Sequence, residues 1–196
     1  MPAALDSPVP SATEPRLQVF FGLIATGKST LARAWAARHG REYYNSDVVR
    51  KELAGLDAAT RCREEADRGI YTPEFSRRTY AELLQRAAGD LRRGRGVVLD
   101  ASYLERAERD RVAALAQTLG VPVDFVLCEC SDEVKRERLA IRARDSRAVS
   151  DGSWAIYLRQ REKFQPPTEL KPEQLVVIDT ARPLEQLLAE LARLLA

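Results

Sequence analysis

The chain has 196 residues, of which 45% are hydrophobic and 31% charged, and its formal net charge is +2. This composition fits a single globular domain with a substantial core, and the near balance of charge is unlike that of a dedicated nucleic-acid-binding protein. No apolar run is long enough to span a membrane, and the start has neither the basic nor the apolar region of a secretory signal. Three cysteines, Cys62, Cys128 and Cys130, show no metal-binding spacing, and their odd number favours a reducing, cytoplasmic location.

The chain begins with a proline-rich stretch, residues 1 to 15, which we expect to be a flexible tail before a single domain over residues 16 to 196. Residues 22 to 29 then fit the phosphate-binding pattern G-x-x-x-x-G-K-[ST] and lie between an apolar run at 17 to 21 and a helical pattern. Glycines let backbone N–H groups approach the β-phosphate, and the helix adds the positive end of its dipole. The residues expected to bind ATP here are Gly22, Leu23, Ile24, Ala25, Thr26, Gly27, Lys28, Ser29 and Thr30.

The polar residues of this loop have separate expected roles. Lys28 should reach the β- and γ-phosphates and take part in catalysis, and the Ser29 hydroxyl should ligate Mg²⁺. Thr30 is expected to add a contact with the α-phosphate. Ala25 stands where many such loops carry a third glycine, so we expect its backbone angles to stay in regions open to an L-residue.

A second motif follows a short strand at residues 41 to 45, where a new helix begins. Asp47 lies at the carboxyl end of that strand, which is the edge where open α/β sheets bind ligands. Arg50 follows three residues later, on the same face of the helix. We interpret Asp47 as the group that orients or deprotonates the acceptor hydroxyl, and Arg50 as the group that holds an anionic or polar part of the acceptor. The alternative is a helix cap with a solvated arginine.

A third motif is the buried apolar run at residues 97 to 100, which comes after a helix expected at about 73 to 93 and ends in an aspartate. Asp100 has the position of a Walker B residue, where it would hold Mg²⁺ through water or orient the acceptor. A helix cap is again the alternative. No second acid follows, because Ala101 is next, and this argues against a motor or switch ATPase.

An arginine-dense stretch at residues 136 to 147 is typical of a helix–loop–helix lid over ATP, which we expect at about residues 136 to 164. Arg138 and Arg142 share one helical face, and with Arg144 they would neutralise the charge on the transferring phosphoryl group. We expect Arg142 to be catalytic and Arg138 to bind ATP. We also expect Arg182 to bind ATP, because it lies in the loop after the last strand, where adenine commonly rests. A solvated basic face is the alternative for this segment.

Five short apolar strands alternate with helices along the chain. This order predicts an α/β fold with three layers: a five-stranded parallel sheet, helices on both faces with right-handed crossovers, and a helical lid. The expected strands are residues 17–21, 41–45, 97–100, 123–130 and 175–179.

The chain resembles the small P-loop kinases of the nucleoside-monophosphate-kinase-like type. It is most similar to bacterial predicted kinases with an AAA-type ATP-binding domain, which are related to 5′-hydroxyl polynucleotide kinases and zeta toxins. The resemblance rests on residues 22–30, 46–50, 97–100 and 138–144. It implies that Asp47 is the general base and that Arg50 contacts an acceptor phosphate. It also implies that Asp100 is the third-strand aspartate and Arg142 a lid arginine. In this branch such a domain is sometimes fused behind an aminoglycoside-phosphotransferase-like domain.

These features predict a kinase that depends on ATP and Mg²⁺ and phosphorylates an alcohol. The near-neutral charge favours a small-molecule acceptor such as a sugar, nucleoside or antibiotic, whereas the spacing of Asp47 and Arg50 favours the 5′-hydroxyl of DNA or RNA. A zeta-like toxin and an ATP-binding regulatory module without transfer are the further alternatives. The sequence gives no indication of the oligomeric state.

Overall fold

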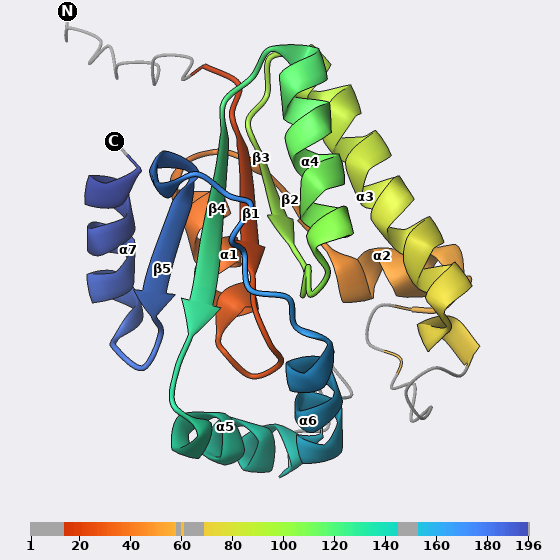
Figure 1. Cartoon of the computed structure of the whole chain (residues 1–196), viewed down its shortest axis with the longest axis vertical. Helices are drawn as coiled ribbons and strands as arrows, with labels where there is room; N and C mark the ends of the chain where they lie inside the picture. The colour runs from red at the N-terminus through yellow and green to blue at the C-terminus, as the bar shows by residue number, and fades with distance from the viewer. Residues whose placement is uncertain (1–13, 58–59, 61–68, 145–152, 196) are drawn as a thin grey trace, which may run out of the picture.

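The structure is a computed structural model that describes residues 14–57, 60, 69–144 and 153–195, except for the side chain of Arg144. The predicted tail therefore lies outside the described residues up to position 13. The five strands form one parallel sheet, as expected, and their order in it is β2-β3-β1-β4-β5 (Figure 1). The strands are β1 (Leu17–Phe21), β2 (Glu42–Asn45), β3 (Val97–Asp100), β4 (Val123–Glu129) and β5 (Leu175–Asp179).

Helices cover both faces of this sheet, which completes the predicted three layers (Figure 1). Helices α3 and α4 bury their apolar residues on one face, and α1 and α7 bury theirs on the other. Helix α2 follows β2 directly and contacts α3. These helices are α1 (Lys28–Arg38), α2 (Ser46–Leu53), α3 (Pro73–Arg92), α4 (Arg106–Leu119) and α7 (Leu184–Leu194).

Two further helices, α5 (Asp132–Arg144) and α6 (Trp154–Lys163), lie beyond the carboxyl ends of the strands (Figure 1). They correspond to the predicted lid, which we expected over residues 136 to 164. The chain returns from α6 through residues 164 to 174, which include the short 3-10 helix η2 (Pro172–Gln174), and enters the edge strand β5. The second 3-10 helix, η1 (Gly69–Tyr71), precedes α3.

Capping explains several of these boundaries. The Thr72 hydroxyl accepts a hydrogen bond from Phe75 N at 3.2 Å, and Pro73 occupies the first turn of α3, where a missing N–H costs nothing. Ser153 caps α6 in the same way. Gly120 ends α4 with φ 65°, a conformation that glycine adopts at low cost.

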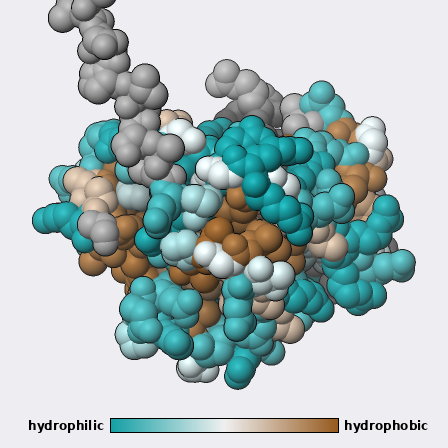
Figure 2. Space-filling model, turned by 90° about the horizontal axis from the view of Figure 1, so that it is seen from above, coloured by the Kyte–Doolittle hydropathy of each residue, from teal (hydrophilic) through white to brown (hydrophobic). Residues whose placement is uncertain are grey.

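Large apolar side chains are mostly inside the molecule. Among the described residues, the exposed large hydrophobic ones are Ile141 (60%), Val177 (54%) and Leu194 (52%). Figure 2 views the end that faces away from the lid, where hydrophilic residues surround smaller apolar areas. None of the helices in the described ranges is both long and apolar enough to cross a membrane. Ile141 is the exposed apolar residue of this group that borders the cleft described below.

A fully buried arginine holds the segment that leads from the lid back to β5. Arg109 on α4 donates from Nε to Glu169 Oε1 at 2.5 Å and from Nη2 to Glu169 Oε2 at 3.2 Å. The same guanidinium donates to the carbonyl oxygens of Tyr103 at 2.8 Å and Gln165 at 2.9 Å. The hydrogen bonds of this one guanidinium therefore connect α4 with the loop after β3 and with residues 164 to 174, which lead from α6 back to β5.

Replacing Arg109 with alanine is expected to lower the free energy of unfolding by roughly 3–5 kcal/mol, because Glu169 is left as a buried charge without its partner. Urea unfolding of the purified chain measures this difference. The matched control is Arg106→Ala on the same helix, whose pair with Asp110 is exposed and should contribute less than about 1 kcal/mol. Equal effects of the two substitutions would contradict a stabilising role for the buried pair.

Candidate active site

A cleft of about 1090 Å³ lies at the carboxyl edge of the sheet, bounded by the phosphate-binding loop, α2, the first turns of α3 and α4, and the lid. It brings together most of the residues that the sequence predicted from four separate motifs. The predicted residues on its walls are Ile24, Ala25, Gly27, Lys28, Ser29, Thr30, Asp47, Arg50, Arg138, Arg142 and Arg182. Gly22, Leu23, Thr26 and Asp100 are not among the wall residues.

The glycines of the loop are required by its conformation. Gly22 has φ 134°, and a Cβ added there would lie 2.5 Å from the carbonyl oxygen of Cys128. Gly27 has φ 81° immediately before α1, and a Cβ there would lie 3.0 Å from Arg138 Nη1. Ala25 has φ 64°, a left-handed value that L-residues rarely adopt and that costs about 1 kcal/mol, so its backbone does not stay in the favoured regions that were expected for it.

Lys28 is the first residue of α1, so it stands at the positive end of the helix dipole. Its Nζ lies 3.5 Å from the carbonyl oxygen of Leu23, which folds the side chain over the loop at the cleft wall. Ser29 and Thr30 follow on the same first turn and also border the cleft. The start of α1 therefore places a cation, two hydroxyl groups and helix N–H groups beside one another, as a phosphate site requires.

Asp47 lies in the first turn of α2, across the cleft from the loop, and is half-buried. Desolvation inside the cleft raises the pKa of its carboxyl above the ordinary aspartate value. The positive charges of Lys28 and Arg50 act in the opposite direction, and the charge of Asp100 adds to the rise. A carboxylate with a raised pKa beside a phosphate-binding loop is a candidate for accepting a proton or orienting a hydroxyl.

Asp100 is fully buried behind this site and is not on the cleft wall. Its Oδ2 accepts hydrogen bonds from the Tyr43 hydroxyl and from Asn45 Nδ2, both at 2.6 Å. Asp100 was expected to hold Mg²⁺ through water or to orient the acceptor, and the structure places Asn45 between Asp100 and the start of α2. The other carboxylate oxygen of Asp100, Oδ1, is buried without a hydrogen-bond partner within the part of the chain that the structure describes.

The Ser29 hydroxyl and the Asp100 carboxylate could together hold Mg²⁺, the first directly and the second through water. Mg²⁺ usually keeps several of its waters and binds through hydroxyl and carboxylate oxygens. The Ser29 hydroxyl is at the cleft, and the unpaired Oδ1 of Asp100 could accept a hydrogen bond from a water of the ion. The two residues predicted as metal ligands therefore have compatible chemistry, with Asp100 acting through water.

Asn45 also belongs to this site, although it was not among the residues predicted from the sequence. Its Oδ1 accepts hydrogen bonds from Asp47 N at 3.0 Å and Val48 N at 3.1 Å, so it caps α2 while its amide group is held by Asp100. An asparagine directly before a helix is a capping signal that could have identified it. The link to Asp100 needs the sheet order, because Asn45 and Asp100 are paired residues on β2 and β3.

We expect Asn45→Ala to lower kcat for phosphoryl transfer by roughly 10- to 100-fold with little change in ATP affinity, because the turn that carries Asp47 loses both of its anchors. Loss of the cap should also cost about 1 kcal/mol of stability. Steady-state kinetics with varied ATP separates these effects. Tyr43→Phe is the control, since it removes the other hydrogen bond to Asp100 and leaves the cap intact. An equal loss in both variants would assign the effect to Asp100 itself.

The predicted lid arginines have different partners. Arg138 donates from Nη2 to the Thr180 carbonyl oxygen at 2.6 Å and from Nη1 to that of Ala25 at 3.3 Å, so it joins the loop after β5 to the phosphate-binding loop. Arg142 is half-buried at the cleft, where desolvation lowers its pKa and the charge of Asp47 opposes this effect. Arg182 borders the cleft and forms an ion pair with Glu190. The Arg144 side chain lies outside the described part.

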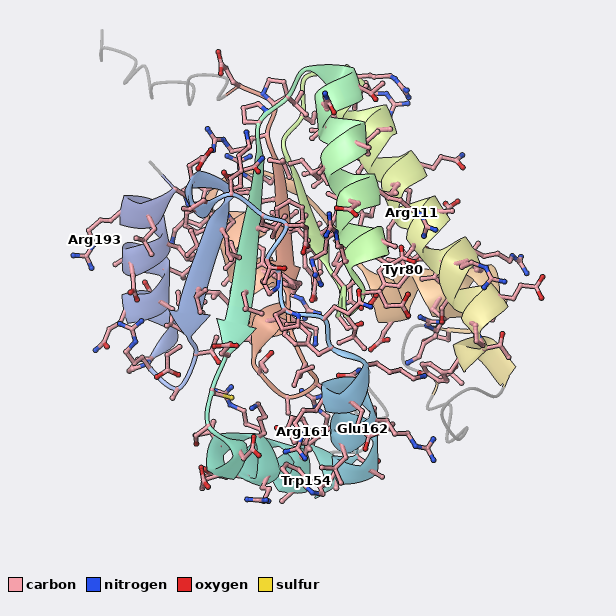
Figure 3. The ribbon with its side chains drawn as sticks, in the orientation of Figure 1. Tyr80, Arg111, Trp154, Arg161, Glu162 and Arg193 are labelled. Carbon is pink, nitrogen blue, oxygen red and sulfur yellow. The ribbon has the colours of Figure 1, made fainter. Side chains whose placement is uncertain are left out.

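The lid also contacts the loop through residues that the motif leaves unspecified. Gln160 Oε1 on α6 accepts a hydrogen bond from Ile24 N at 2.7 Å. Ile24 and Ala25 pack in one apolar cluster with Leu139 of α5 and Tyr157 of α6. Figure 3 shows Trp154 and Arg161 within this pair of helices. The phosphate-binding loop is therefore packed directly against the lid, which the loop pattern alone does not reveal.

Arg50 forms part of the wall opposite the loop. Its Nη1 donates to the Ile70 carbonyl oxygen at 2.7 Å and to Ser76 Oγ at 3.1 Å, and the guanidinium lies 5.1 Å from the centre of the Tyr71 ring. Arg50 is only 7% exposed. In this conformation it holds the start of α3, and its expected contact with an acceptor stays a prediction.

Comparison with known proteins agrees with this architecture. A family profile described as an AAA domain matches residues 17–167. Uncharacterized proteins of Mycobacterium bovis and Mycobacterium tuberculosis are 29% identical over 148 residues, or 75% of this chain. The matched segment makes up 30% of those relatives, so the chain spans less than a third of their length.

Solved structures with this fold include kinases. A gluconokinase from Sinorhizobium meliloti has a TM-score of 0.62 and 24% identity, with 92% of this chain and 93% of that chain covered. A sugar kinase from Janibacter sp. has a TM-score of 0.65 and 21% identity, with 93% and 95% covered. Kti12 from Chaetomium thermophilum, solved with ADP-AlF3, has a TM-score of 0.65 and 17% identity, with 93% and 100% covered. Since the family match covers most of the chain and the sheet, loop and lid agree with it, the chain belongs to the AAA domain family and has the fold of the P-loop kinases.

Proposed function

We propose that the chain is a kinase that depends on ATP and Mg²⁺ and transfers the γ-phosphoryl group to a hydroxyl of a small molecule. The observation that carries the proposal is the position of Asp47. Its carboxyl, with a raised pKa, faces the same cleft as Lys28 and the lid residue Arg142. A nucleotide-binding module without transfer has no need of this acid opposite its phosphate loop.

The proposed reaction is an in-line displacement. The acceptor hydroxyl oxygen forms a bond to the γ-phosphorus, the bond from that phosphorus to the β–γ bridging oxygen breaks, and ADP leaves. Asp47 orients the hydroxyl and receives its proton. Lys28 and Arg142 bind the phosphoryl oxygens as the charge spreads over them. Mg²⁺, bound through Ser29 and through water to Asp100, would neutralise part of the phosphate charge.

Two features support a small acceptor: the elements that enclose the acceptor side of the cleft, and the low net charge of the chain. The acceptor side of the cleft is bounded by α2, by the first turns of α3 and α4, and by α6, and the net charge is only +2. Sugar-phosphorylating enzymes are among the proteins with the same fold. A 5′-hydroxyl of a nucleic acid is the second candidate, favoured by the arginines on the acceptor side, and its binding would weaken steeply with salt.

The test is transfer from γ-labelled ATP in the presence of Mg²⁺ to a panel of sugars, polyols, nucleosides and aminoglycosides, with a short 5′-hydroxyl oligonucleotide alongside. Labelled small-molecule product that disappears in Asp47→Asn supports the proposal. Label on the oligonucleotide alone would replace the acceptor with a polynucleotide. ATP binding with no label on any compound would leave the regulatory-module interpretation.

A further inference from the structure

The acceptor end of the cleft contains polar groups that the proposed transfer does not use. The Tyr80 hydroxyl and Ser102 Oγ lie 3.1 Å apart, and Tyr103 N donates to the Tyr80 hydroxyl at 3.2 Å. Beside them on α4, Glu108 Oε1 accepts a hydrogen bond from Arg111 Nη1 at 2.8 Å. Tyr80, Ser102, Glu108 and Arg111 all border the cleft, and Figure 3 labels Tyr80 on α3 and Arg111 on α4.

Two of the polar atoms in this wall lack a partner. Glu108 Oε2 and Arg50 Nε are buried and make no hydrogen bond to any residue in the described ranges. The Glu108 side chain is 13% exposed and Arg50 is 7% exposed, so bulk water does not satisfy them fully. Buried polar atoms nearly always have a partner in a functional state. Glu108 Oε2 therefore lacks a hydrogen-bond donor, and a hydroxyl group of a ligand in the cleft can supply one.

We propose that Glu108 and Arg111 bind a second hydroxyl of the acceptor, and that the acceptor is therefore a small polyhydroxylated compound of the sugar, polyol or sugar-acid class. This inference rests on the proposed kinase function. The second hydroxyl donates to Glu108 and accepts from Arg111, while the first hydroxyl lies at Asp47. The carboxylate can turn toward it because the last torsion of a glutamate side chain is soft.

The Glu108–Arg111 pair explains how such a site would select its acceptor. An alcohol with a single hydroxyl leaves Glu108 Oε2 buried and unpaired, and sites built to bind a hydroxyl strongly reject analogues that lack it. The half-buried Tyr80 ring packs against Tyr103 and also borders the cleft, and its hydroxyl group is engaged with Ser102. The wall therefore combines an ion pair, hydroxyl groups and an aromatic ring, as expected for a carbohydrate-like ligand.

The experiment measures phosphoryl transfer from labelled ATP to glucose, ribitol and gluconate, and to cyclohexylmethanol and benzyl alcohol as single-hydroxyl compounds. We expect transfer only to members of the first group. For the best acceptor, Glu108→Gln should raise the acceptor KM by roughly 10- to 100-fold, since a hydrogen bond to a charged group is lost. The KM for ATP should stay within about threefold. Asp110→Asn is the matched control, an exposed acid two residues later on α4 with the same change of charge.

Deoxy analogues of the best acceptor separate ligand binding from a structural role for Glu108. In the unmodified chain, removal of the hydroxyl that Glu108 binds should raise KM about as much as Glu108→Gln does. In Glu108→Gln the same removal should cause little further rise, because the two changes delete one interaction. Additive effects for every hydroxyl, with a lowered melting temperature in Glu108→Gln, would instead show that the residue only supports α4.

The remaining outcomes overturn the inference in distinguishable ways. If the single-hydroxyl alcohols, or a 5′-hydroxyl oligonucleotide, are phosphorylated as efficiently as the polyols, the kinase function stands and the assignment of Glu108 and Arg111 fails. If no compound is phosphorylated although ATP binds, the proposed function itself fails, and this inference fails with it.

Discussion

Lys28→Ala is expected to lower phosphoryl transfer by roughly a thousandfold or more. The Lys28 ammonium is the cation that the loop places at the β- and γ-phosphates, and its charge also acts on Asp47 across the cleft. Alanine removes both effects and keeps a good helix former at the start of α1. Transfer should therefore fall far more than stability does.

Labelled-phosphate transfer and thermal unfolding on the same samples test this prediction. Lys171→Ala provides the matched control, because that lysine is exposed before β5 and does not border the cleft. The control should retain full transfer. Substantial turnover by Lys28→Ala would show that the loop at residues 22 to 29 is not the site of the reacting phosphates.

The fold and the phosphate loop could be predicted because their signals are local. Four of the five strands are short, mostly apolar runs, whereas β2 has the sequence Glu-Tyr-Tyr-Asn. The loop pattern fixes glycines where positive φ angles are needed, as at Gly22 and Gly27. The lid was predicted from the arginine density at the end of one helical pattern, followed by a second helical pattern. In each case the information lies within one continuous stretch of the chain.

Contacts that depend on sheet order could not be predicted in this way. Asn45 and Asp100 meet because β2 lies beside β3, and nothing local in either strand specifies that neighbour. Glu108 and Arg111 border the acceptor side only because α4 covers the same face of the sheet as α3. Gln160 reaches Ile24 through the docking of the lid. The type of a residue can indicate that it belongs to a site, but the residues that it contacts there depend on the tertiary structure.

The arginines illustrate the same limit. Arg50 and Arg138 were expected to bind the acceptor and ATP because arginine suits phosphate groups. In the structure both donate to carbonyl oxygens, those of Ile70 and Thr180 respectively, and so hold neighbouring segments in place. A charge pattern can therefore locate a basic wall of a cleft, but it does not separate arginines that hold the wall from those that face the ligand.

Asp47→Asn is expected to lower transfer by roughly 100- to 10 000-fold while ATP binding stays unchanged. The amide keeps the shape of the side chain but cannot accept the proton of the acceptor hydroxyl. Titration with a fluorescent ATP analogue and labelled-phosphate transfer measure the two properties separately. Asp110→Asn on α4 serves as the control for a loss of one negative charge. A loss of ATP affinity in Asp47→Asn would place this carboxylate in the nucleotide site instead of the acceptor site.

Because the pKa of Asp47 is raised, we can predict the direction in which pH changes the rate of transfer and the direction in which Asp47→Asn changes the stability of the fold. Transfer needs the ionised carboxylate, so activity should fall as the pH drops through the raised pKa, starting at a higher pH than an ordinary aspartate would give. The residual activity of Asp47→Asn should lack this acidic limb. A pKa raised in the folded state means that ionisation of Asp47 opposes folding at neutral pH. The asparagine variant should therefore unfold at the same or a higher temperature, so that lost transfer reflects the missing carboxylate and not a damaged fold.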